Sequence, residues 1–241
     1  MRVIVFLLTA LAAGLIQGVT GFGSGIVQMM SYPLYWPVPA AAAISTCVSV
    51  PLNVNMLLTY MCEVRWRKVL LPVMPYLALC SAAISYSRQA DPVLVKKLFG
   101  VLLILLAIYY LTPNRNRTGI KKPLGLPVSI IYIAVSAVCD AFFGIGGPLM
   151  VLYFLNKTEG AKEYYGTISA FFLINGIYTT VYRFAGGILA LEHLPYIAMG
   201  IPAILIGVIL AHRLVSRLND GMIRKCTYVM IGITGIINIV G

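Results

Sequence analysis

The sequence predicts an all-α integral membrane protein with about eight transmembrane segments in two homologous repeats, each with a glycine-rich broken or re-entrant helix. Of its 241 residues, 60% are hydrophobic and only 10% are charged, whereas a soluble domain is nearer half apolar and a quarter charged. Several uncharged runs reach the roughly 20 residues that span a bilayer. Two glycine-rich stretches, 18–28 and 142–152, interrupt such runs in corresponding places of the two halves.

Eight apolar segments and their polar separators define the expected elements. The segments are 3–21, 39–61, 69–87, 94–112, 127–143, 164–184, 194–212 and 223–240. Polar stretches such as EVRWRK at 63–68 and PNRNRTGIKK at 113–122 separate them. Because the second of these lies near the midpoint, we divide the chain into a first repeat at 1–112, a basic linker at 113–123 and a second repeat at 124–241.

The first segment leads into the first glycine-rich stretch. The start, MRVIVFLLTALAAG, is also compatible with a signal peptide, but its counterpart at 126–141 favours retention. No charged residue occurs over 3–35. A single helix of that length would measure about 50 Å, well beyond a hydrocarbon core of about 30 Å. An interruption at Gly21, Gly23 and Gly25 would divide it into a full span and a shorter piece.

Three short matches in the same order indicate the repeat. Gly21-Phe22-Gly23 aligns with Gly144-Ile145-Gly146, Gln17 with Asp140, 44–55 with 168–179, and 94–101 with 222–229. Duplicated membrane proteins are most often transporters, with the substrate near the midplane where the halves meet. For a plain eight-helix topology the basic residues divide equally between the two sides of the membrane. Orientation, and the choice between parallel and inverted repeats, therefore stay open.

The second segment carries a polar face. Ser45, Ser49 and Asn53 follow one another at spacings of four, which places them on one side of a helix. In the corresponding segment of the second half, Ser169 and Asn175 share a face only loosely. Such side chains either bind the oxygens of an anion or form interhelical hydrogen bonds. We favour binding for Asn53 and Asn175, which recur in matching places, and packing for the serines.

The fifth segment contains the one acidic residue that lies within an apolar run. This residue, Asp140, precedes the second glycine-rich stretch, where Gly144, Gly146 and Gly147 interrupt the helix and Pro148 suits the first turn of the next one. An ionisable group inside the membrane is a functional candidate by default. We expect Asp140 to carry a coupling proton or to tune the second interruption. The alternative is a structural role as a cap of backbone N–H groups.

The remaining polar residues point to few further sites. Arg183 ends the sixth segment as a candidate for attracting an anion at a cavity mouth, although anchoring at the membrane interface is the simpler role. His193 and His212 lie at segment ends without companion ligands, and the five cysteines show no metal-binding spacing. We therefore expect no metal and no cofactor. No catalytic triad or carboxylate pair lies within one membrane region, so we expect no enzyme.

The glycine-rich stretches suggest an anion site. Irregular backbone at membrane depth is tolerated only where protein buries it or where it lines a wet cavity. Its free N–H groups and the positive end of the next helix favour an anion. The expected substrate site comprises Gln17, Gly21, Phe22, Gly23, Ser24, Gly25, Asn53, Gly144, Gly146, Gly147 and Asn175. The alternative is that these glycines only allow close helix packing.

This combination resembles the TauE/SafE family of sulfite and organosulfonate exporters. The resemblance rests on the two glycine-rich segments, each followed by a helix with serine and asparagine, and on the basic midpoint loop. It covers essentially the whole chain and implies transport of a small sulfur-containing anion, such as sulfite or a short sulfonate like sulfoacetate. The first interruption departs from the pattern, because it reads GFGSG where Gly-Gly-Gly-type strings are expected.

The sequence therefore predicts a secondary transporter, with export as the expected direction, of a small sulfur-containing anion. Coupling to protons is one option, and an ion channel or a non-transporting membrane scaffold is the alternative. The net charge of +11 resides in short loops, which fits anionic lipid rather than nucleic acid. The expected partners are the anion and membrane lipid, with a homodimer allowed. The expected location is the cell membrane, as a multi-pass protein.

Overall fold

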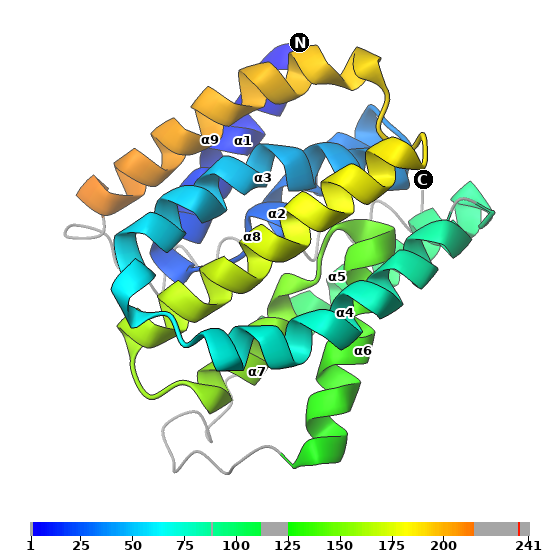
Figure 1. Cartoon of the computed structure of the whole chain (residues 1–241). Coiled ribbons are helices and arrows are strands. Elements are labelled where there is room, and N and C mark those ends of the chain that lie inside the picture. Colours follow the sequence, from blue (N-terminus) through cyan, green and yellow to red (C-terminus); the bar gives the residue numbers. More distant parts are fainter. Residues whose placement is uncertain (1, 88, 112–124, 215–235, 237–241) are drawn as a thin grey trace.

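In the computed structural model the chain forms a bundle of helices (Figure 1). The structure describes residues 2–87, 89–111, 125–214 and 236. Every regular element in these ranges is helical, which confirms the all-α prediction. Helical stretches long and apolar enough to cross a membrane are 2–19, 38–63, 66–87, 126–143 and 191–211.

The described elements coincide with the first seven expected segments to within a few residues. In order they are α1 (Arg2–Thr20), α2 (Ser24–Gln28), η1 (Tyr32–Leu34), α3 (Val38–Tyr60), η2 (Met61–Glu63), α4 (Trp66–Ser87), α5 (Pro92–Leu111), α6 (Leu126–Phe143), α7 (Gly147–Lys157), α8 (Ala161–Ala185), η4 (Leu191–His193) and α9 (Leu194–Leu214). The expected eighth segment at 223–240, except residue 236, and the linker at 113–123 lie outside the described residues. The total of eight spans stays a prediction.

Both glycine-rich stretches separate a long helix from a shorter one. Between α1 and α2, Gly21 and Gly23 have φ angles of 81° and 103°. Between α6 and α7, Gly144 has a φ of 64°. This left-handed region is open to glycine but costly for residues with a Cβ atom. α7 then begins at Gly147 with Pro148 in its first turn, where a missing N–H costs nothing.

α1 packs along α9 through small residues, although the two helices lie at opposite ends of the described chain (Figure 1). A Cβ atom at Gly14 would collide with the carbonyl oxygen of Ile204, and one at Gly207 would collide with that of Leu11. One turn further on, a Cβ atom at Gly18 would lie 2.7 Å from that of Ala211. Small residues thus allow the close backbone approach that drives helix association in a membrane.

The other main contacts also join early and late parts of the chain. α3 lies alongside α8 in the middle of the bundle, and α4 packs on α6 (Figure 1). The polar face of α3 that carries Ser45, Ser49 and Asn53 is buried, and its side chains contact α1 and α2. The serines and the asparagine therefore face protein rather than lipid, and they border the region where the glycine-rich interruptions come together.

Candidate functional site

The two glycine-rich interruptions are in direct contact. A Cβ atom at Gly25 would lie 2.6 Å from the carbonyl oxygen of Gly144, so only glycine allows this approach. A Cβ atom at Gly147 would lie 3.8 Å from the ring of Phe22, which comes from the other interruption. Segments more than a hundred residues apart in the chain therefore form one site.

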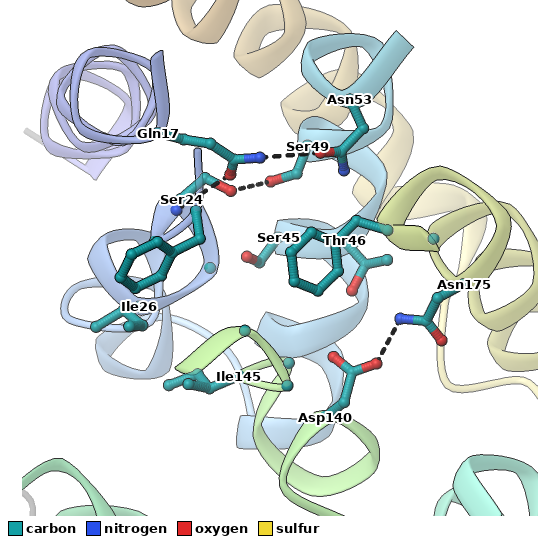
Figure 2. Close-up of a pocket in the computed structure, with 18 residues that line it drawn as sticks. Gln17, Ser24, Ile26, Ser45, Thr46, Ser49, Asn53, Asp140, Ile145 and Asn175 are labelled. Atoms are coloured by element: carbon teal, nitrogen blue, oxygen red, sulfur yellow. Dashed lines mark hydrogen bonds between the residues drawn. The ribbon is translucent and has the colours of Figure 1, made fainter. Parts of the chain in front are cut away.

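A polar cavity occupies this junction (Figure 2). It is open to the centre of a water-sized sphere over about 70 Å³. About 10–15 Å³ of such space holds one water, so the cavity has room for several waters or for one small polyatomic ion. Polar side chains and glycines line it, chiefly Gln17, Ser24, Ser45, Thr46, Ser49, Asn53, Asp140, Asn175, Gly23, Gly25, Gly144, Gly146, Gly147 and Gly176.

On one side of the cavity a neutral network holds the first interruption. The Gln17 side chain donates from Nε2 to Asn53 Oδ1 at 2.9 Å, and its Oε1 accepts the backbone N–H of Ser24 at 3.2 Å. The hydroxyls of Ser24 and Ser49 are 3.0 Å apart, and Gln28 Nε2 donates to Ser49 Oγ at 3.1 Å. Gln17 thereby caps the start of α2 from the end of α1.

On the opposite side the same kind of contact involves a carboxyl group (Figure 2). Asn175 Nδ2 donates to Asp140 Oδ2 at 2.7 Å, and the Cys80 thiol approaches the same oxygen at 3.9 Å. Asp140 is 7% exposed. The pair of Gln17 with Asn53 therefore has a counterpart in Asp140 with Asn175, each joining the end of one long helix to the next long helix.

Arg183 lies behind the cavity wall and is 1% exposed. Its Nη2 donates to the carbonyl oxygens of Asp140 at 2.7 Å and Ala141 at 3.1 Å, at the end of α6. Its Nη1 donates to Thr46 Oγ1 at 2.9 Å and, at 3.4 Å, to the Ala42 carbonyl on α3. The positive charge therefore sits at the carboxyl end of α6, which carries the negative end of the helix dipole.

Two further side chains, which the sequence reasoning missed, fix the second interruption. Ser136 donates from Oγ to the carbonyl oxygen of Gly146. Tyr76 of α4 donates from its hydroxyl to the Ser136 carbonyl at 3.3 Å and fills the place that a Cβ atom at Gly146 would need. The only sequence signal for Ser136 was its position four residues before Asp140, which places both on one face of α6.

A comparison with known families adds to this geometry. The family model described as Sulfite exporter TauE/SafE matches residues 6–237. The chain belongs to the TauE/SafE family. No curated protein and no solved structure matches it. With the long apolar helices, membership makes this TauE/SafE protein a multi-pass protein of the cell membrane, and it confirms the resemblance seen in the sequence.

In this TauE/SafE protein the predicted site residues fall into two groups. Those that line the cavity are Gln17, Phe22, Gly23, Ser24, Gly25, Asn53, Asp140, Gly144, Gly146, Gly147 and Asn175. Gly21 and Arg183 do not line it. A Cβ atom at Gly21 would lie 2.6 Å from the ring of Tyr165, so this glycine makes room for an aromatic side chain. The part of these residues in binding an anion stays a prediction.

The cavity also brings in residues for which the sequence favoured packing. These are Ser45 and Ser49, whose hydroxyl groups line it together with that of Thr46. Among the described residues that line it there is no lysine, arginine or histidine. Across the described ranges, no group of three His, Cys, Asp or Glu side chains is placed to hold a metal ion. The chemistry that the cavity offers is hydrogen bonding from hydroxyls, amides and backbone, with one carboxyl group.

Proposed function

We propose that this protein is a secondary transporter that exports a small sulfur-containing anion, such as sulfite or a short organosulfonate. The observation that carries the proposal is the polar cavity between two touching glycine-rich interruptions. Family membership supports the sulfur-containing class of substrate, since the matching family is one of sulfite exporters.

The donors around the cavity suit a compact oxyanion. The hydroxyls of Ser45 and Ser49 and the backbone around Gly25 and Gly146 converge on the same small space. Hydroxyl and backbone N–H groups bind the oxygens of sulfite or sulfonate without the rigid geometry that a metal demands. An anion held mainly by such neutral donors is bound weakly enough to be released, which transport requires.

The pattern of helix contacts fits two interlocked four-segment repeats. If α1, α3 and α4 correspond to α6, α8 and α9, then the first long segment of each half packs on the third long segment of the other, as α1 does on α9 and α6 does on α4. The interruptions then lie in equivalent places near a shared centre. A midplane site between two repeats is the arrangement that secondary transporters use.

Asp140 is the group that we propose to carry the coupling proton. Of the residues that the structure describes, it is the one ionisable residue in the cavity lining, and its carboxyl group faces the space that the anion would occupy. A fixed negative charge there opposes an anion, whereas a protonated carboxyl does not. Protonation of Asp140 would therefore favour loading.

Flux measurements on the purified protein in liposomes test the transport proposal. Labelled sulfite, sulfoacetate, taurine and chloride are supplied in turn, with protein-free liposomes as the control. We expect saturable uptake of sulfite, and acceleration of that uptake by unlabelled sulfite trapped inside. Linear, non-exchanging conductance of chloride would instead identify a channel, and no flux of any of the four would overturn the proposal.

A further inference from the structure

Two buried ionisable side chains border the cavity, one acidic (Asp140) and one basic (Arg183), and they do not form an ion pair with each other. The Asp140 carboxyl group accepts from Asn175, while the Arg183 guanidinium donates to backbone carbonyls and to Thr46. In the part of the chain that the structure describes, the ion pairs are Lys68 with Glu163 and His193 with Glu192. Arg183 thus has no carboxylate partner there, although it is 1% exposed.

Each neighbouring element brings few other charges to this place. The ionisable groups facing Asp140 are the Cys80 thiol and the Tyr76 phenol of α4, with Arg183 of α8 at its backbone and Cys139 before it on α6. α3 contributes hydroxyls and an amide to the cavity, and α2 and α7 contribute backbone and one serine. The charge at the site is therefore set by Asp140 and Arg183.

These two charges limit what the cavity can hold. With Asp140 ionised, the empty site is neutral, because Arg183 balances it. A singly charged anion added to this state leaves one uncompensated negative charge in a buried place, which is costly. If Asp140 takes up one proton, the anion is balanced by Arg183 and the loaded site is neutral again. A doubly charged anion leaves an excess negative charge in either state.

We infer that the cavity selects singly charged sulfur anions and carries one proton with each of them, in an electrically neutral cycle. The inference rests on the proposed transport function and narrows its substrate class. Singly protonated sulfite and monosulfonates fit, whereas sulfate and doubly ionised sulfoacetate do not. Both the loaded and the empty forms are neutral at the site, so the membrane potential does no net work on the cycle.

The wild-type protein in liposomes tests this charge rule without any substitution. Methanesulfonate serves as the singly charged probe, because its acid is too strong to cross lipid in neutral form, and sulfate serves as the doubly charged one. With the potential clamped by potassium and valinomycin, an interior more alkaline by one pH unit is expected to accumulate methanesulfonate about tenfold. A potential of about 60 mV, which shifts a singly charged cargo about tenfold, is expected to have no effect.

The Asp140→Asn variant reverses these two dependences if the inference is right. In this variant the bound anion alone balances Arg183, so the loaded site is neutral without a proton. The empty site keeps the positive charge of Arg183. Each transport cycle therefore moves one net charge across the membrane. Methanesulfonate accumulation is then expected to follow the potential, about tenfold per 60 mV, and to ignore the pH gradient. Glu192→Gln removes an exposed carboxylate outside the cavity, and it is expected to keep the wild-type behaviour.

The outcomes separate this inference from the transport proposal. If no sulfur anion moves at all, the proposed function is overturned and the charge rule falls with it. If methanesulfonate moves but follows the potential in the wild type, or if sulfate moves equally fast, only the charge rule is overturned. If a pH gradient still drives methanesulfonate accumulation in Asp140→Asn, the charge rule is likewise overturned. Should that variant fail to fold, the wild-type measurements decide the question.

Discussion

The two glycine-rich interruptions resemble each other in shape and differ in charge. Each leaves a long helix through a left-handed glycine and enters a shorter helix, and each has an amide contact from the next long helix. At the first interruption the hydrogen-bonded side chains among the described residues are neutral, and they include Gln17, Asn53, Ser24 and Ser49. At the second, the corresponding place holds a carboxyl group.

The two halves of the site therefore differ in the type of side chain that binds the asparagine, an amide in one and a carboxyl group in the other. Gln17 binds Asn53 and the backbone of Ser24 at once, and its hydrogen-bonding capacity does not change with pH. Asp140 has a carboxyl group in the corresponding place, and Arg183 donates to the backbone carbonyl at the end of its helix. The two pairs therefore differ at one position, where the first has Gln17 and the second has Asp140, while both keep the contact with an asparagine.

The contact between the interruptions is the first feature to break. In Gly25→Ser the new Cβ atom would lie 2.6 Å from the Gly144 carbonyl oxygen, which belongs to the backbone and cannot rotate away. We expect destabilisation of about 3 kcal/mol, the upper end for overpacking, and loss of sulfite flux. Gly160→Ser is the control, because nothing lies within 4 Å of a Cβ atom there. Equal thermal stability of the two variants in detergent would contradict the close contact.

Removal of Arg183 breaks the second interruption alone. In Arg183→Gln the carbonyl of Ala141 loses its donor and the end of α6 loses its compensating charge. A buried acceptor left without a partner costs about 1–3 kcal/mol, so we expect a loss near 2 kcal/mol in the free energy of unfolding. Thermal unfolding in detergent measures it. Adding Asp140→Asn should recover part of the loss, and complete additivity of the two substitutions would argue against electrostatic coupling between them.

The two asparagines sharpen the comparison directly. Asn175→Ala removes a hydrogen bond to a carboxyl group, which is worth about 1.5–3 kcal/mol when that group is ionised. Asn53→Ala removes a neutral bond, and such bonds between membrane helices average about 0.6 kcal/mol. We therefore expect the first variant to be the less stable of the two, as measured by thermal unfolding in detergent. A larger loss of unfolding free energy in Asn53→Ala than in Asn175→Ala would show that the carboxyl group of Asp140 does not strengthen its hydrogen bond.

An ion pair away from both interruptions serves as the reference for the stability contribution of the charges at the cavity. Lys68 Nζ lies 2.7 Å from Glu163 Oε1. Burial tends to raise the pKa of Glu163, but the hydrogen bond and charge of Lys68 outweigh it and hold that pKa below its usual value. The pair therefore stabilises the fold above the unfolded pKa of Glu163, and this stability is lost as the pH falls through the folded pKa.

The expected cost of Glu163→Gln is accordingly small. Surface ion pairs contribute less than about 1 kcal/mol, and the loss should disappear in acid, where the wild type is protonated too. Thermal unfolding across a pH series measures it. A cost as large as that of Arg183→Gln would mean that the Lys68 pair, rather than the charges at the cavity, dominates the electrostatic stability.

Hydrophobic runs predicted the helices well, because length and apolarity alone decide whether a segment can sit in a bilayer. The glycine strings and Asp140 also predicted much of the cavity lining, since each breaks a local rule of membrane helices. Contacts between distant helices left weaker traces. Nothing in the local pattern around Arg183 shows that it reaches the end of α6, and Tyr76 becomes relevant only because α4 packs on α6.

The close packing of α1 on α9 has a consequence for how the protein is made. α1 is complete at Thr20, but its partner begins only at Leu194. At a synthesis rate of about 5–20 residues per second, roughly 10–40 s pass between completion of α1 and completion of α9. During that time Gly14 and Gly18 present a bare groove to lipid, or to any other helix with small residues. During synthesis, association of α1 with an incorrect helix therefore competes with its later association with α9.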